Sequence, residues 1–205
     1  MKADKIVISE IFSYLMAYEA QNPVKADGIF MFCRTDKRLA ITMASLLDAD
    51  LAGYGLIVGG IGKDSGVLAD INLPEALYLA SIIHWEYGIP DNRLLVESTA
   101  STGAEASRRG IETIRQSGRP HERLIMVAHP TSLRRLWAMH LSIAGELGFS
   151  ANYQLVSTAY PFDPENPVDQ REAKAELLRL ANWPAKGWAV PQRDLPEDLV
   201  SWARK

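Results

Sequence analysis

The sequence predicts an α/β domain in which helices cover both faces of a mainly parallel sheet. Short continuous apolar runs, typical of strands buried on both faces, recur along the chain. Longer segments with helical periodicity separate these runs, and such alternation implies crossover connections between parallel strands. A chain of 205 residues that is 47% hydrophobic and 23% charged can bury the core of one such domain.

The first expected element is a helix over 6–18. Glu10 and Ser13 interrupt its apolar pattern, and it is shorter than the about 20 residues that a membrane span needs. The segment also lacks a cleavage signature. We therefore interpret it as an amphipathic helix of the core, and we expect a cytoplasmic protein without a membrane span.

The next segments alternate between strand and helix. An apolar run over 28–33 predicts a strand, and Asp36 is placed to cap the helix that follows. The apolar stripe of that helix would contain Leu39, Met43, Leu46 and Leu47. A second strand is expected over 55–58, and it leads into a glycine-rich loop.

A further helix is expected after the glycine-rich loop. Asn72 would be its N-cap, with Pro74 and Glu75 in its first turn, and the helix would run to Tyr87. Later, Thr102 opens a capping-box pattern. The remaining expected elements are a strand over 93–97, a helix over 102–116, a strand over 123–128, a helix over 130–148, a strand over 153–157 and a helix over 169–181.

The end of the chain is rich in tryptophan and proline. We expect 162–205 to be a helical C-terminal extension that packs on the rest of the chain, so that 1–205 forms one domain.

Composition argues against several classes of partner. The formal net charge is −3 and no long basic run occurs, so nucleic acid is not an expected partner. The single cysteine, Cys33, excludes an internal disulfide and cysteine-rich zinc sites. The four histidines lack the spacing of known zinc motifs, so no metal is expected.

Candidate ligand-binding residues follow the strands, because ligands bind at the carboxyl edge of an open parallel sheet. Arg34, Lys37 and Arg38 follow the first strand, where they could meet an anion near a helix N-terminus or only be solvated. Gly59, Gly60 and Gly62 follow the second strand, where backbone N–H groups could approach a ligand or form a plain surface turn. The loop fits neither standard phosphate motif, because Asp64 follows Lys63 and Ser65 stands where the dinucleotide fingerprint needs glycine.

Three polar side chains are candidates for acid–base chemistry or hydrogen bonding. Glu97 closes a strand, where it could accept ribose hydroxyls or act as a base. His129 also lies at a strand end, where it could be a general acid or base, or a histidine with only structural hydrogen bonds. Glu105 could contact a ligand or serve only as the capping-box partner of Thr102.

Arg134 and Arg135 lie near the start of a predicted helix. Positive charge at the positive end of the helix dipole costs up to about 1 kcal/mol. A bound anion would reverse the sign of this term, since arginine offers a two-pronged contact to phosphate or carboxylate. The alternative is that each arginine pairs with an acidic neighbour or extends into solvent.

Taken together, the motifs GGIGKDSG, ESTASTGAE and HPTSLRR resemble those of the YdcF/SanA-type family, a bacterial group named for a domain of unknown function. The resemblance covers about 26–161 and is closest to the soluble YdcF-like branch. It implies a Rossmann-like three-layer fold and an enzyme without an established reaction. Soluble relatives are reported to bind S-adenosylmethionine, whereas SanA-like relatives are membrane anchored and linked to envelope integrity.

The resemblance also assigns residues. It places the family's functional positions on Gly59, Gly60, Glu75, Glu97, Glu105 and Arg135. The chain departs from the family pattern at Thr102, Gly103, Ala106 and Ser132. Two side-chain amides that could hold a ligand in relatives are therefore missing here.

The expected function is binding of a small anionic or nucleotide-like ligand at the carboxyl edge of the sheet, with S-adenosylmethionine as the candidate cofactor. The glycines would donate backbone N–H groups, and Arg135, with Arg134 or Arg38, would hold negative charge. Glu75, Glu97 and His129 are the catalytic candidates, and Thr102 and Glu105 are further ligand contacts. The alternative is a non-catalytic sensor or a cell-envelope-related interaction module that uses the same pocket. A metal-dependent hydrolase is a weaker third interpretation.

Overall fold

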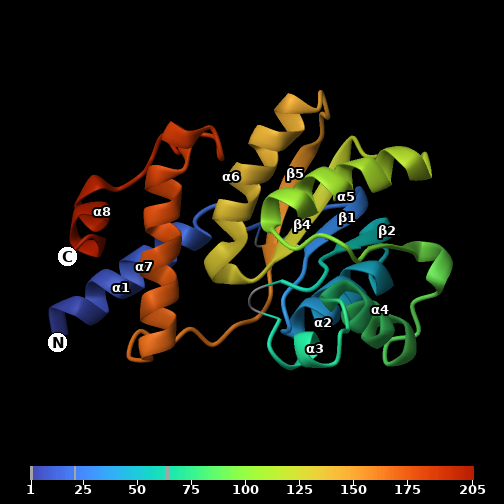
Figure 1. Cartoon of the computed structure of the whole chain (residues 1–205), viewed down its shortest axis with the longest axis horizontal. Helices are drawn as coiled ribbons and strands as arrows, with labels where there is room; N and C mark the ends of the chain where they lie inside the picture. The colour runs from blue at the N-terminus through green and yellow to red at the C-terminus, as the bar shows by residue number, and fades with distance from the viewer. Residues whose placement is uncertain (1, 21, 63–64) are drawn as a thin grey trace.

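A parallel sheet forms the centre of the computed structural model, which describes residues 2–20, 22–62 and 65–205 (Figure 1). The strands in these ranges are β1 (Ala26–Phe32), β2 (Ala52–Val58), β3 (Leu94–Glu97), β4 (Arg123–Ala128) and β5 (Asn152–Ser157). Their order is β3-β2-β1-β4-β5, and every neighbouring pair is parallel. The chain thus builds outward from β1 to β3 and then crosses back to β4, so the order reverses between β1 and β4.

Helices cover both faces of the sheet (Figure 1). One face packs against α2 (Arg38–Asp48) and α4 (Glu75–Trp85), and the other against α5 (Gly103–Ser117) and α6 (Pro130–Glu146). Alternate residues of β1 point to opposite cores, because successive strand side chains alternate between the faces. The structure therefore confirms the predicted α/β class with a Rossmann-like three-layer arrangement.

The two ends of the chain meet outside α6. Helix α1 (Lys2–Met16) and helix α7 (Pro167–Asn182) both contact α6, and α8 (Glu197–Ala203) contacts α1 and α7. Figure 1 shows these three helices beside one another at the edge of the molecule that carries both termini. No helix within the described residues has the length and apolarity needed to cross a membrane.

Strand β2 is longer than the expected 55–58 and begins at Ala52. Two glycines of β1 and β2 are sites of close packing. A Cβ at Gly55 would lie 2.7 Å from Met43 Sδ, and a Cβ at Gly28 of β1 would lie 2.3 Å from the ring of Tyr54. Glycine in these strands therefore makes room for large neighbours without ending the strand.

The predicted start of α4 is wrong at Asn72. This residue has a φ of 53°, in the left-handed region, and follows the short helix α3 (Val67–Asp70), which the sequence analysis did not predict. The Asn72 and Leu73 N–H groups donate to the carbonyls of Ala69 and Leu68, which is the pattern of a helix end. Asn72 thus ends α3, and the N-cap of α4 is Pro74.

The predicted start of α5 is confirmed, because Thr102 is its N-cap and Thr102 Oγ1 accepts from the Glu105 N–H at 3.2 Å. The N-cap of α2 is Lys37 instead of the expected Asp36, although Asp36 Oδ1 accepts from the Arg38 N–H at 3.0 Å at the same helix start. The elements absent from the prediction also include the short 3₁₀ helices η1 (Asp91–Arg93) and η2 (Pro184–Lys186).

Candidate functional site

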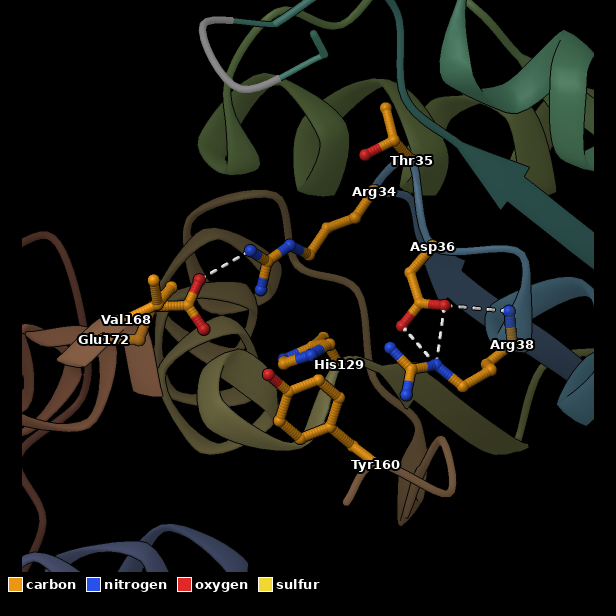
Figure 2. Close-up of a pocket in the computed structure, with 8 residues that line it drawn as sticks. All are labelled: Arg34, Thr35, Asp36, Arg38, His129, Tyr160, Val168 and Glu172. Atoms are coloured by element: carbon orange, nitrogen blue, oxygen red, sulfur yellow. Dashed lines mark hydrogen bonds and ion pairs between the residues drawn. The ribbon is translucent and has the colours of Figure 1, made fainter. Parts of the chain in front are cut away.

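A cavity of about 250 Å³ lies at the carboxyl edge of the sheet, where the strand order reverses (Figure 2). We call it the switch-point cavity. Open α/β sheets bind ligands at this place because the loops on either side diverge there. Its lining residues come from the loop after β1, the start of α2, the residue between β4 and α6, the loop after β5 and helix α7: Arg34, Thr35, Asp36, Arg38, His129, Tyr160, Val168 and Glu172.

The strand register brings these segments together. Met31 of β1 pairs with Val127 of β4, so the chain leaves both strands side by side. Helix α2 begins at Arg38 and α6 begins at Pro130, directly after the loops that line the cavity. Both helix N-termini therefore contribute positive potential at this edge.

Two arginines face the cavity, and each is held by a carboxylate. Arg38 Nε donates to both carboxylate oxygens of Asp36, at 2.8 and 3.0 Å. Arg34 Nη2 donates to Glu172 Oε1 at 2.5 Å. Although burial opposes the effect, the hydrogen bonds from Arg38 lower the pKa of Asp36, and those from Arg34 lower the pKa of Glu172. Both carboxylates are therefore ionised at neutral pH.

Arg38 retains donors for a ligand. Its two terminal Nη atoms make no hydrogen bond to any described residue, while Nε is fixed by Asp36. The guanidinium also lies over the ring of Tyr160, with 4.7 Å from Cζ to the ring centroid. In Figure 2 the guanidinium groups of Arg34 and Arg38 reach toward the space beside His129 from different sides.

His129 forms the back of the cavity and is buried. Its Nδ1 lies 2.8 Å from Thr131 Oγ1, and the ring of Tyr160 packs edge-on against it at 4.5 Å. Burial, followed by the positive charge of Arg34, lowers the pKa of His129 to about 4. The imidazole is therefore neutral at pH 7.

Tyr160 closes the cavity from the loop after β5. Its hydroxyl donates to Asp169 Oδ1 at 2.6 Å. This hydrogen bond, and then burial, raise the pKa of Tyr160 to about 12. The phenol therefore stays protonated at neutral pH and lends the cavity a polar but uncharged wall.

The predicted acids Glu75 and Glu97 do not line the switch-point cavity. Glu75 Oε1 accepts from the buried hydroxyl of Ser65 at 2.9 Å. Glu97 Oε1 accepts from the Thr99 N–H at 2.9 Å, and its Oε2 accepts from the Ala100 N–H at 3.2 Å. Both buried carboxylates stabilise the loops that follow β2 and β3.

The glycine loop uses its N–H groups internally. Gly59 donates to the Glu97 carbonyl at 2.9 Å, Gly60 to the Ala100 carbonyl at 2.7 Å and Gly62 to Ser65 Oγ at 2.8 Å. A Cβ at Gly60 would lie 2.9 Å from the carbonyl oxygens of Ser98 and Ala100, so this loop packs directly on the loop after β3. The predicted backbone cradle therefore has its three donors occupied in this conformation. Lys63 and Asp64 lie outside the described residues.

Thr102 and Glu105 lie at the start of α5 and serve as caps. The carboxylate of Glu105 accepts from the N–H and the hydroxyl of Ser101, both at 2.8 Å. These hydrogen bonds lower the pKa of Glu105. Neither residue lines the switch-point cavity, whereas Glu105 lines a second cavity of about 370 Å³ on α5 together with Arg108 and Arg109.

Arg134 and Arg135 also lie away from the cavity and are paired with acidic neighbours. The fully buried guanidinium of Arg134 bonds Asp194 at 2.5 Å and the Tyr14 carbonyl at 2.7 Å. Arg135 bonds Glu176 of α7. The acid-pairing alternative thus describes both arginines, and the carboxylates offset the dipole cost that suggested an anion site.

The candidate site residues are therefore divided between places. Arg38 and His129 meet in the switch-point cavity, whereas Gly60, Glu97 and Arg135 share no cavity with them. Sequence reasoning missed Thr131, Tyr160 and Glu172. Thr131 could have been found from the sequence, because it follows the candidate His129 by two residues. Tyr160 and Glu172 have no local sequence signal, because only the path of the chain after β5 brings them to the cavity.

Comparison with known proteins assigns no family. No protein-family model matches the chain, and no curated protein matches it at a significant level. The resemblance to the YdcF/SanA-type family stays a prediction. Within the described ranges, no three or more His, Cys, Asp or Glu side chains are grouped so that they could hold a metal ion.

Proposed function

We propose that the protein binds a small anionic ligand in the switch-point cavity, held by Arg34 and Arg38. The observation that carries this proposal is Arg38: Asp36 fixes its Nε, while its two Nη atoms face the cavity with no hydrogen-bond partner among the described residues. A guanidinium fixed in this way binds a carboxylate or phosphate without first losing side-chain freedom.

The cavity volume bears on the size of the ligand. Typical small-molecule sites enclose about 300–1,000 Å³, and the switch-point cavity is smaller, at about 250 Å³. It suits a single carboxylate or phosphate group, or the charged end of a larger molecule. S-adenosylmethionine is our cofactor candidate as a larger molecule that places its charged end in the cavity. Its amino-acid end carries a carboxylate that an arginine can bind and an ammonium that Asp36 or Glu172 can bind.

Sulfate is a suitable first probe because it carries no proton near neutral pH. Sodium sulfate titrated into the protein, against sodium chloride at equal ionic strength, should give saturable binding by calorimetry. Arg38→Gln should weaken binding at least about tenfold, which corresponds to about 1.4 kcal/mol. Arg108→Gln is the matched control, because Arg108 is an exposed arginine of α5 paired with Glu146. Equal affinities in both variants would refute the site.

A second titration series identifies the ligand class. Adenosylmethionine, adenosylhomocysteine, nucleotides and sugar phosphates are compared by the rise in melting temperature, which follows mass action when a ligand binds only the folded state. A ligand whose effect disappears in Arg38→Gln occupies the cavity.

A binding role without catalysis is the second candidate. It is favoured by Glu75 and Glu97, because both expected acid–base residues accept hydrogen bonds from their own loops and lie outside the cavity. Under this proposal, Glu97→Gln lowers stability but leaves sulfate affinity unchanged. Turnover of a bound ligand that is lost in His129→Gln would favour an enzyme instead.

A further inference from the structure

A chain of hydrogen bonds runs along the wall of the switch-point cavity from α7 to the imidazole of His129. Glu172 Oε2 lies 3.1 Å from Thr131 Oγ1, and Thr131 Oγ1 lies 2.8 Å from His129 Nδ1. All three side chains are buried or half-buried. These contacts connect a carboxylate, a hydroxyl and an imidazole in one continuous series of hydrogen bonds.

The direction of each hydrogen bond follows from the charge of Glu172. Arg34 lowers the pKa of this carboxyl, so it is ionised and can only accept. Thr131 therefore donates its single hydroxyl hydrogen to Glu172. Its oxygen can then only accept from His129, which requires the hydrogen of the neutral imidazole to sit on Nδ1. The lone pair is left on Nε2.

Nε2 of His129 is the nitrogen available to a ligand. It makes no hydrogen bond to any described residue, and His129 lines the cavity. A hydrogen bond that orients a base from its far side is a recurring feature of enzymes with acid–base or nucleophilic chemistry.

We propose that Thr131 and Glu172 are positioning residues that hold His129 as the Nδ1–H tautomer, so that Nε2 accepts a proton at the anion site. The proton comes from water or from a hydroxyl of the bound ligand. The part of this inference that concerns the anion rests on the proposed function, whereas the tautomer does not.

A bound anion strengthens this base. The charged and titratable groups around His129 are Arg34 and Asp36 from the loop after β1, Arg38 from the start of α2, Glu172 from α7, and Tyr160 from the loop after β5. Burial and the two arginines lower the pKa of His129, while Glu172 and Asp36 raise it. An anion on the two guanidinium groups offsets their charge, and it therefore raises the affinity of Nε2 for a proton.

The tautomer is measured without any ligand. A ¹⁵N–¹H correlation spectrum of the imidazole side chains distinguishes the nitrogen that carries hydrogen from the one that does not, and His129→Gln identifies the signals of His129 among those of the four histidines. We expect hydrogen on Nδ1 and a bare Nε2 at pH 7. Thr131→Val removes the acceptor without changing the side-chain shape, and it should abolish this preference.

Thr131→Ser is the matched control, because it keeps the hydroxyl and should keep the tautomer. A loss of folding in Thr131→Val would be visible in the same spectrum. In that case the tautomer of His129 in the wild type is the only test of the proposed hydrogen bonds. The positioning role of Thr131 and Glu172 is overturned if the wild type carries hydrogen on Nε2, or if folded Thr131→Val has the same tautomer as the wild type. Either outcome holds whether or not sulfate binds.

Sulfate tests the second half of the proposal. The pKa of His129, followed by the same signals, should rise by about 1 to 3 on saturation with sulfate, as expected for a new opposite charge nearby. Arg38→Gln should remove most of this rise. An unchanged pKa in the sulfate-bound protein overturns the role of Nε2 at the anion site. Absence of sulfate binding overturns both the proposed function and the expected rise in the pKa of His129. The tautomer of His129 then still tests the positioning role of Thr131 and Glu172.

Discussion

Glu172 and Arg34 face each other across the switch-point cavity, with 2.5 Å between Oε1 and Nη2. One partner belongs to α7 and the other to the loop after β1, so the C-terminal part of the chain completes a site built by the sheet. The side chains are about one-third exposed, at 29% and 38%. The Glu172 carboxylate is therefore paired with an arginine, Arg34, that a ligand in the cavity could also contact.

Glu172→Gln should tighten sulfate binding. Glutamine keeps the size of the side chain but no longer neutralises Arg34, so sulfate meets less competition for this arginine. Exposed ion pairs contribute up to about 1 kcal/mol, and the expected gain is up to about fivefold in the dissociation constant measured by calorimetry. Glu86→Gln, an exposed change directly after α4 with the same loss of charge, is the control. Unchanged or weaker binding in Glu172→Gln would show that the pair does not compete with the ligand.

Gly60→Ala should destabilise the fold in the absence of any ligand. The new Cβ would lie 2.9 Å from the Ser98 and Ala100 carbonyl oxygens, which are backbone atoms that cannot rotate away. Overpacking of this kind costs about 1–3 kcal/mol, measured as a lower urea midpoint. Gly62→Ala is the control in the same loop, because its nearest contact would be Ser101 O at 3.4 Å. Equal stability of the two variants would point to a role for Gly60 other than packing.

Arg134→Met should be much more destabilising than Arg135→Met. Arg134 is fully buried, and it bonds Asp194, Gln192 and the Tyr14 carbonyl, so its loss removes the hydrogen bonds by which it joins the C-terminal segment to α1 and α6. Removing one partner of a buried ion pair costs about 3–5 kcal/mol. Because Asp194 is partly exposed and can regain water, we expect the lower end of this range, measured by urea unfolding.

Arg135→Met is the matched control for that change. Glu176 retains Arg179 as a partner at 2.5 Å, so no buried carboxylate is left alone, and we expect a loss of about 1 kcal/mol. If the two variants lost equal stability, burial of Arg134 would not be what makes its ion pair important.

The fold could be predicted from the sequence because its signals are local. Apolar runs such as 28–33 and 123–128 mark buried strands, and Thr102 marks a helix start by a hydrogen bond to a residue three positions away. Asn72 shows the limit of this reasoning, because one residue type both caps helix starts and adopts the left-handed conformation that ends them.

The site was predictable only in part. Arg38 and His129 could be found because they follow strands that meet where the sheet order reverses. Arg135 suggested an anion because its charge opposes the helix dipole, but its partner Glu176 lies on α7, 41 residues further along the chain. Glu172 reaches His129 through the same docking of α7. A pairing across so many residues has no local pattern in the sequence, and only the folded chain reveals it.

Stability should fall as the pH decreases from about 6.5 toward 4, and His140 should account for much of the loss. This histidine is fully buried between Phe30, Phe32 and Tyr153, and burial lowers its pKa to about 4. In the unfolded chain its pKa is about 6.5. Between these values the unfolded state binds the proton and the native state does not, so the free energy of unfolding increases with pH. The contribution of His140 is fully present above about pH 6.5.

At pH 5 this difference corresponds to a loss on the order of 2 kcal/mol from His140. The buried His129, whose pKa is lowered in the same direction, adds to it. His140→Gln does not titrate and can still accept from the Tyr153 hydroxyl, which lies 2.8 Å from Nε2. The variant should therefore lose on the order of 2 kcal/mol less than wild type between pH 7 and pH 5, measured as the change in unfolding free energy of each protein. His84→Gln makes the same substitution at a half-buried position on α4, and it controls for the general effect of replacing a histidine by glutamine. An equal loss in His140→Gln and wild type would mean that His140 does not stay neutral in the native core.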